Sequence, residues 1–235
     1  MVLFFSSDKK KIYNMNSILK ISILVIISGV IIAGIILPIP FIPALGDKAR
    51  ILYFHVPMSW IAVLAFFMSM YYSIRYLKTR DNDFDVRSYS AASLGFMFCI
   101  LATATGSLWA KFSWGSFWNW DPRQTSIFIL LLIYGAYFAL RSAIDSDEQR
   151  AKLSSVYSII AAVTVPFFVF IMPRLVESLH PDPIVNTQGK INMDSTMLSI
   201  FLTSLFGFTL LFFWCLNIKV RIERLNLKHL RSITG

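Results

Sequence analysis

The sequence predicts an all-α integral membrane protein with six transmembrane helices, and three observations support this fold class. First, 56% of the 235 residues are hydrophobic and only 15% are charged, whereas soluble proteins usually carry about 25% charged residues. Second, charges are sparse in six apolar runs suited to helices that cross the roughly 30 Å hydrocarbon core of a bilayer: residues 18–37, 56–77, 89–110, 126–140, 153–172 and 196–218. Third, Lys and Arg are distributed unevenly between the two sides that these runs define.

The first run, 18–37, follows a polar segment that contains Lys9, Lys10 and Lys11, and it is ended by Pro38. A basic start before an apolar run also resembles a secretory signal peptide, but the apolar part of such a peptide is only about 7–15 residues long. We therefore expect an uncleaved membrane anchor.

The later runs carry two further signals. Pro166 lies inside the fifth run and predicts a kink there, since proline removes a helical hydrogen bond. Acidic and basic residues occur only near the ends of the runs. This argues against a proton relay or an ion path, because such paths usually contain ionisable groups within the membrane.

The basic residues indicate the orientation of the chain. Sixteen Lys and Arg residues fall on the side of both termini, and six fall on the other side: Lys48, Arg50, Lys111, Arg123, Arg174 and Lys190. Because cytoplasmic loops are enriched in Lys and Arg, we expect a cytoplasmic N-terminal segment (1–17), a six-helix membrane domain (18–218) and a basic cytoplasmic tail (219–235). The net charge of +9 is explained by this topology in a lipid bilayer and does not indicate nucleic-acid binding.

Between the third and fourth runs lies a segment rich in aromatic residues, here called the tryptophan segment (residues 114–125), which contains three of the six tryptophans. Indole has an apolar body and a polar N–H, so such a segment suits the surface of a membrane. Trp114 and Trp118 would share one face if the segment were helical, and Trp120 would then point elsewhere. An ordinary aromatic belt is the alternative, although belts scatter over several helix ends.

Two other residues of the tryptophan segment have structural as well as functional interpretations. Asp121 followed by Pro122 is typical of a helix N-cap with proline at the first helical position. A direct role of Asp121 in a binding site remains equally open. Gly115 would allow the backbone to approach a ligand closely.

The three histidines are His55, His180 and His229. His229 falls in the basic tail, whereas His55 and His180 fall on the same predicted outer side as the tryptophan segment. A lone histidine at a helix end is more often a hydrogen-bonding surface group than a ligand. Two histidines beside an aromatic platform instead suggest haem, for which histidine is a common axial ligand.

Other metal chemistry fits this pattern less well. Zinc prefers three or four nitrogen, sulfur or oxygen ligands, and both cysteines, Cys99 and Cys215, lie in predicted spans. Neither belongs to a C-x-x-C pair, so covalent haem attachment and thiol exchange are not indicated. On the outer side, Arg50, Lys111 and Arg123 could pair with the propionates of a porphyrin or simply meet lipid headgroups.

Three motifs resemble those of one known family. The tryptophan segment resembles the WWD signature of haem-handling proteins, and its matching residues are Trp114, Gly115, Trp118, Trp120, Asp121, Arg123 and Thr125. The motifs Tyr53-x-His55-Val56-Pro57 and Ser178-Leu179-His180-Pro181 resemble the two histidine motifs that flank this signature. With these motifs in the right order over about 18–218, the chain is similar to the CcmC (haem exporter protein C) family.

Two departures from the family pattern concern the surroundings of the motifs. Phe117 and Asn119 stand where other members often have different residues. The residues before His180 lack the paired tryptophans that many members carry.

The resemblance implies that haem b is held at the outer membrane face by the WWD segment, with His55 and His180 as axial ligands of the iron. It implies delivery to a periplasmic haem chaperone, CcmE, together with the ABC transporter subunits CcmA and CcmB and a small membrane subunit, CcmD. The expected location is a bacterial inner membrane or, alternatively, a mitochondrial inner membrane. Such a protein binds and delivers haem and is not expected to be an enzyme.

Three alternatives stay open at this point. The chain could be a membrane subunit or scaffold of an ABC-type haem export complex that does not itself bind haem. It could be a membrane b-type cytochrome, although such redox enzymes normally need histidines within their spans. It could also be a cytochrome c synthetase, although those relatives are usually longer.

Overall fold

The computed structural model describes residues 15–39, 46–180 and 193–234, which form helices and connecting turns without a β-strand. The elements follow in the order α1 (Ser17–Ile36), η2 (Gly46–Ile51), α2 (Leu52–Thr79), α3 (Asn82–Trp114), α4 (Pro122–Ser142), α5 (Asp147–Pro166), η3 (Phe167–Ile171), α6 (Met172–Leu175) and α7 (Ser195–Thr234). Here η2 is a 3₁₀-helix and η3 is a π-helix.

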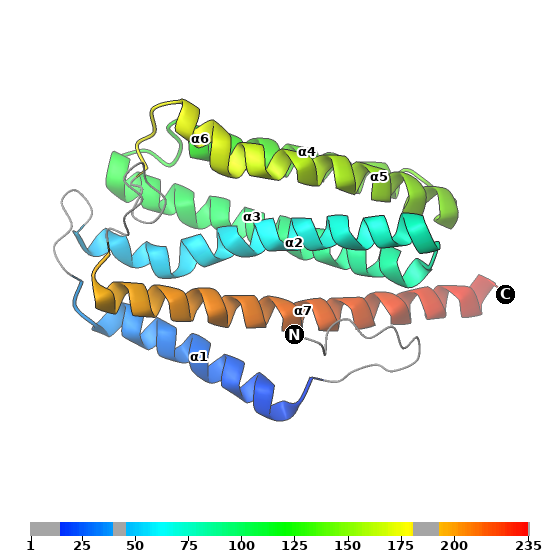
Figure 1. Ribbon diagram of the computed structural model, residues 1–235, viewed down its shortest axis with the longest axis horizontal. Helices are drawn as coiled ribbons and strands as arrows, with labels where there is room; N and C mark the ends of the chain where they lie inside the picture. The colour runs from blue at the N-terminus through cyan, green and yellow to red at the C-terminus, as the bar shows by residue number, and fades with distance from the viewer. Residues whose placement is uncertain (1–14, 40–45, 181–192, 235) are drawn as a thin grey trace.

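Six helical stretches within the described ranges are long and apolar enough to cross a membrane. They correspond one to one with the six predicted runs, so the prediction of an all-helical fold with six candidate spans is confirmed. The helices run side by side along the long axis of the molecule (Figure 1).

The helices form layers around α2 and α3, which pack against each other along most of their length. As Figure 1 shows, α4 and α5 lie on one side of this pair, and α7 followed by α1 lies on the other. The core includes a stacked pair from α2 and α4, Phe66 and Tyr134, whose ring centroids are 3.5 Å apart. Most of α1 is exposed, as expected for a helix that meets lipid.

Helix α2 begins earlier than the sequence predicts, and this changes the position of His55. We expected the span to start at Val56, just after His55, but the helix starts at Leu52 and follows directly on η2. Pro57 therefore lies inside the helix, where it has no N–H to donate to the carbonyl of Tyr53. The hydroxyl of Ser204 on α7 donates to this carbonyl instead, so the turn that carries His55 is fastened to α7.

Two other helices depart from the predicted boundaries. Directly after Pro166, where a kink is predicted, the chain forms the π-helix η3. Helix α7 continues to Thr234, so most of the predicted tail (219–235) extends the sixth helix. Most of the predicted N-terminal segment, including Lys9, Lys10 and Lys11, lies outside the described residues, as do Lys190 and Pro181.

The bundle has two ends with different contents. The site end is the one where α3 ends and α4 begins, and it carries the tryptophan segment. The remote end is the one where α2 ends and α3 begins. These names are used below for the corresponding halves of the bundle.

Candidate functional site

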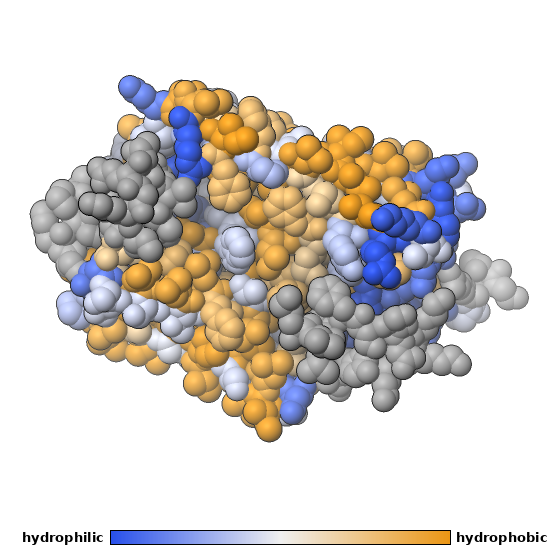
Figure 2. All heavy atoms as spheres, in the orientation of Figure 1, coloured by the Kyte–Doolittle hydropathy of each residue, from blue (hydrophilic) through white to orange (hydrophobic). Residues whose placement is uncertain are grey.

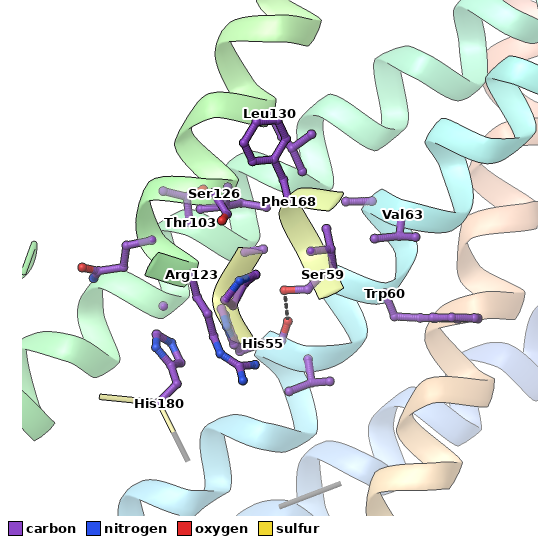
Figure 3. Close-up of a pocket in the computed structure, with 18 of the residues that line it drawn as sticks. His55, Ser59, Trp60, Val63, Thr103, Arg123, Ser126, Leu130, Phe168 and His180 are labelled. Atoms are coloured by element: carbon purple, nitrogen blue, oxygen red, sulfur yellow. Dashed lines mark hydrogen bonds between the residues drawn. The ribbon is translucent and has the colours of Figure 1, made fainter. Parts of the chain in front are cut away.

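A cavity of about 330 Å³ lies in the site end between α2, α3, α4 and the η3–α6 stretch. Its lining includes His55 from α2 and His180 from the chain that follows α6 (Figure 3). The structure therefore brings together the two histidines that the sequence singled out, although 125 positions separate them along the chain. Trp109 and Trp118 also line this cavity.

The ring of His55 is held by helix α3. Its Nδ1 lies 3.1 Å from the hydroxyl oxygen of Thr105. The single hydroxyl hydrogen of Thr105 is already directed to the carbonyl of Leu101, at 2.8 Å, so the oxygen accepts from His55 and the proton is on Nδ1. In a neutral imidazole this leaves the lone pair on Nε2, the form that binds a metal.

Space for the His55 ring is provided by Gly106. A β-carbon at this position would lie 2.8 Å from Cε1 of His55, closer than real side-chain contacts allow. Neither Thr105 nor Gly106 was among the predicted site residues. No local signal identifies them, because their role depends on how α3 faces α2.

The ring of His180 is held by Asp121, which has two functions at once. Asp121 is the N-cap of α4, since its Oδ1 accepts from the backbone N–H of Arg123 at 2.9 Å. The same oxygen lies 2.9 Å from Nδ1 of His180. The cap predicted from the sequence is confirmed. Asp121 also contacts a candidate ligand but lies outside the cavity lining, so its direct role in binding stays a prediction.

The other carboxylate oxygen of Asp121 fixes the chain beside the histidine. Oδ2 accepts from the hydroxyl of Ser178 at 2.9 Å and from the backbone N–H of Leu179 at 2.8 Å. Burial by itself would raise the pKa of Asp121, but the hydrogen bonds from His180 and from the N–H groups of Arg123 and Leu179 outweigh it and hold the pKa below its ordinary value.

Asp121 is consequently a carboxylate at neutral pH, and it accepts the Nδ1 proton of His180. The lowered pKa means that its contribution to stability is present above the ordinary aspartate pKa of about 3.9 and is lost only as the pH falls through the lower folded value. With Nδ1 occupied, Nε2 of His180 is the nitrogen left for a metal. A carboxylate behind a ligating imidazole is the usual outer partner of such a ligand.

Indole rings surround His180. Its ring centroid lies 4.8 Å from that of Trp114 and 5.6 Å from that of Trp109, and the two indoles contact each other edge to face at 4.9 Å. Trp109 is almost completely buried, and its Nε1 has no hydrogen-bond partner within the described part of the chain. Trp109 lies in the third predicted run, five residues before Trp114, and was not among the predicted site residues.

Residues 115–121 of the tryptophan segment are not helical, so the condition under which Trp114 and Trp118 would share one face is not met. Helix α3 ends at Trp114 because Gly115 adopts φ +83°, a left-handed conformation that suits glycine at a helix C-terminus. Trp118 instead packs against Trp120 and Phe128, at 5.8 and 5.9 Å between centroids. This places Trp114 beside His180 but outside the cavity lining, whereas Trp118 belongs to the lining.

The loop from 115 to 121 keeps its shape through polar contacts that the sequence did not indicate. The side chain of Gln124, in the first turn of α4, accepts from the N–H of Asn119 at 2.9 Å and donates to the carbonyl of Phe117 at 3.2 Å. Trp120 adopts φ +55° and is 72% exposed. A left-handed bulky residue is strained, and here the contacts of Gln124 maintain the loop that contains it.

The candidate cations divide into two groups. Arg123 and Arg174 line the cavity, and Arg174 was not among the predicted site residues. Arg50 donates to the carbonyls of Gly34 and Leu37 at the end of α1, at 2.6 and 2.9 Å. Lys111 donates to the carbonyl of Gly115 at 3.0 Å. Arg50 and Lys111 lie outside the cavity lining, so their pairing with propionates stays a prediction.

Together these groups suit a flat ligand with a metal at its centre. Two imidazoles and two indoles line one cavity, and two guanidinium groups in the same lining suit acidic substituents. Within the described ranges no group of three or more His, Cys, Asp or Glu side chains could hold a bare metal ion. The two imidazole donors fit haem, whose porphyrin supplies the remaining four ligands of the iron.

Comparisons with known proteins agree with this chemistry. A family model described as heme exporter protein C matches residues 4–233. The chain is 33% identical over 167 residues to the heme exporter protein C of Bradyrhizobium diazoefficiens, which covers 71% of this chain and 63% of that protein. It is 32% identical over 170 residues to a putative ccmC-like mitochondrial protein of Marchantia polymorpha, 72% of each chain. Identity to the heme exporter protein C of Escherichia coli is 30% over 71% of this chain and 66% of that protein.

Proposed function

Because this chain belongs to the heme exporter protein C family, we propose that it holds haem b at the outer face of the membrane and delivers it during cytochrome c maturation. The observation that supports this most directly is the similar placement of the two imidazoles. Each lines the common cavity and has Nδ1 within hydrogen-bond distance of an oxygen of another element, Thr105 or Asp121, which leaves Nε2 as the nitrogen for the iron.

In this proposal His55 and His180 are the axial ligands of the haem iron. Trp109, Trp114 and Trp118 cover the porphyrin, and Arg123 and Arg174 attract its propionates. Trp120 projects from the rim and meets lipid or a partner. Haem is bound without a covalent bond, since no C-x-x-C-H motif is present, and this allows the chain to hand it on.

The partners proposed for this hand-over are the haem chaperone CcmE, the ABC transporter subunits CcmA and CcmB, and the small membrane subunit CcmD. The excess of Lys and Arg at the remote end supports an orientation with both termini in the cytoplasm and the cavity on the opposite, outer side. The membrane is a bacterial inner membrane or, given the similarity to a mitochondrial protein, a mitochondrial one. The role is binding and delivery, without catalysis by this chain.

Optical spectroscopy of the purified full chain tests the proposal. Haem-loaded protein should show the Soret and Q bands of a bis-histidine complex. H55A and H180A should each lose that spectrum or most of their haem, because a single imidazole cannot maintain six-coordinate bis-histidine iron.

The third histidine provides the matched control, since His229 is exposed on α7 in the predicted tail. H229A should keep the wild-type spectrum and haem content. A wild-type spectrum in both H55A and H180A would refute the ligand assignment. Wild-type protein without haem, even after incubation with excess haem, would favour a scaffold subunit of an export complex.

A further inference from the structure

The cavity that contains the two histidines opens through the side of the helix bundle. Trp60 from α2 and Phe170 from η3 both belong to its lining and are 45% and 43% exposed. Figure 2, viewed across the helix axes, shows the surface hollowed between α6 and the start of α2. Both residues belong to candidate membrane spans, so this opening faces lipid.

The course of α5 explains why the opening exists. In the remote half, α5 is tied to α2 by a hydrogen bond of 2.9 Å between Ser69 and Ser158. After Pro166 the chain widens into the π-helix η3, and the η3–α6 stretch packs against α4. There the hydroxyl of Ser126 on α4 contacts the sulfur of Met172, the first residue of α6, at 3.3 Å. The chain thus packs against α2 in the remote half, as α5, and against α4 in the site half, as the η3–α6 stretch. The space that this leaves beside α2 in the site half is the opening.

The cavity changes character along the helix axes. Arg123 and Arg174 line the part near the tryptophan segment. Val63, Leu130 and Phe168 line the deeper part (Figure 3). Val63 is eight residues beyond His55 on α2, about 12 Å further into the membrane at 1.5 Å per residue. The wall therefore runs from cationic near the membrane surface to apolar further in.

Haem dissolved in a bilayer has the same polarity. Its propionates stay at the headgroups, because moving a carboxylate into hydrocarbon is costly, and its apolar edge points to the membrane centre. We propose, resting on the haem-binding function above, that the opening between α2 and η3–α6 is a loading port through which haem slides edge-on from the outer leaflet to the two histidines.

The direction of this movement is what makes the port suitable. A porphyrin that moves in the plane of the membrane keeps its propionates at the level of Arg123 and Arg174 throughout. Its apolar edge passes from lipid to the apolar part of the cavity. No charged group is desolvated, and neither His55 nor His180 needs to leave its oxygen partner before the iron arrives.

A reversible plug in the port tests this directly. Phe170 is replaced by Cys in a background with Cys99→Ala and Cys215→Ala, and the full chain in phosphatidylcholine vesicles is modified with benzyl methanethiosulfonate. After haemin is added to the vesicles, the appearance of the bis-histidine Soret band measures loading. We expect the plug to slow loading by about tenfold or more, and removal of the label with a phosphine reductant to restore the unmodified rate.

Two controls make the outcome unambiguous. Ala104→Cys carries the same label on an exposed position of α3 outside the cavity lining, and it should load at the unmodified rate. Protein loaded with haem before labelling should keep its spectrum, which shows that the ligands are intact. If the label disturbs that spectrum, Ser59→Trp on the α2 wall of the cavity replaces it as the plug.

Loading of the plugged protein within twofold of the unmodified rate would overturn the port, and so would equal slowing by the label at Ala104→Cys. Either result leaves the haem-binding proposal standing as long as the bis-histidine spectrum forms. Failure of the unmodified protein to bind haem at all would instead refute the function from which the port follows.

Discussion

The two halves of the bundle use their polar side chains in different ways. In the remote half they pair with one another across helices. Arg141 of α4 forms two hydrogen bonds with Asp85 of α3, at 2.8 and 2.6 Å, and both side chains are largely buried. Asp83 accepts from Arg87 on its own helix and from Arg224 on α7, each at 2.8 Å.

In the site half the polar groups instead leave one nitrogen of each histidine available. Thr105 and Asp121 each lie within hydrogen-bond distance of Nδ1 of an imidazole, and both imidazoles belong to the cavity lining. The difference shows that the remote half joins α3, α4 and α7 into one unit, while the site half orients ligands. Damage to the first should lower stability, and damage to the second should lower haem affinity.

The largest expected effect comes from breaking the buried ion pair of the remote half. Asp85→Ala leaves the guanidinium of Arg141 buried without its carboxylate, a change that typically costs about 3–5 kcal/mol. We expect a large loss of folded protein in detergent, measured by thermal unfolding. The double variant Asp85→Leu/Arg141→Met should recover most of the loss, because an apolar pair of similar volume replaces the ions.

The comparison between the halves is tested by the haem spectrum of the same variants. The fraction of Asp85→Ala that remains folded should bind haem with the wild-type bis-histidine spectrum. A changed spectrum in folded protein would show that the two halves are coupled, and the division of roles would then be wrong.

The next largest effect is expected at the outer partner of His180. Asp121→Asn keeps a good helix N-cap, since asparagine and aspartate cap about equally well. It removes the negative charge behind the imidazole and can donate to Nδ1, which favours the tautomer with the proton on Nε2. We expect haem affinity to fall about 10–100-fold, measured by haem titration, with helix content unchanged by circular dichroism.

Asp121→Ser separates the two functions of this residue. Serine also caps a helix well but places no carboxylate beside His180. Equal loss of haem affinity in the Asn and Ser variants would assign the effect to the carboxylate. Wild-type affinity in both would mean that Asp121 acts only as a cap.

The fold could be predicted well from the sequence because the signals for membrane-spanning helices are local. Each candidate span is an apolar run whose composition alone suits a bilayer, and all six are found. The cap at Asp121 was predicted for the same reason, since Asp followed by Pro acts within a few residues. The end of α3 at Trp114 has a local signal too, because glycine commonly follows the last helical residue, although the third run was predicted to end at residue 110.

The support of the two histidines could not be predicted in this way. Thr105 and Gly106 matter because α3 turns this face toward His55, 50 positions earlier in the chain. The hydrophobic pattern of a membrane helix is similar all round, so it does not show which face meets a neighbour. The choice of His55 and His180 came from their shared side and from motif resemblance, and the structure adds the oxygen atoms that orient them.

A smaller effect is expected from filling the space beside His55. Gly106→Ala places a methyl group 2.8 Å from the present position of Cε1 of His55, so the ring must move. The strain of such overpacking is typically about 1–3 kcal/mol, and we expect about tenfold weaker haem binding with a shifted Soret band. Gly135→Ala on α4 is the matched control, because nothing lies within 4 Å of its added carbon. An unchanged spectrum in Gly106→Ala would show that the ring has other room.

The smallest loss of haem affinity is expected when the oxygen partner of His55 is removed. Comparing this loss with that of Asp121→Asn shows which histidine depends more on its oxygen partner. Thr105→Val keeps the shape of the side chain but removes the acceptor of the Nδ1 proton. The hydrogen bond is between neutral groups and contributes about 1 kcal/mol, whereas the bond from His180 to Asp121 is charge-assisted and stronger. We therefore expect only about a fivefold loss of haem affinity, measured by haem titration.

Thr203→Val on α7 is the matched control for this substitution. The hydroxyl of Thr203 donates to the carbonyl four residues earlier on its own helix, at 2.8 Å, as that of Thr105 does, but Thr203 is exposed and lies outside the cavity lining. Its replacement should leave haem affinity unchanged. A loss in Thr105→Val larger than that in Asp121→Asn would reverse the ranking and make His55 the ligand whose orientation limits binding.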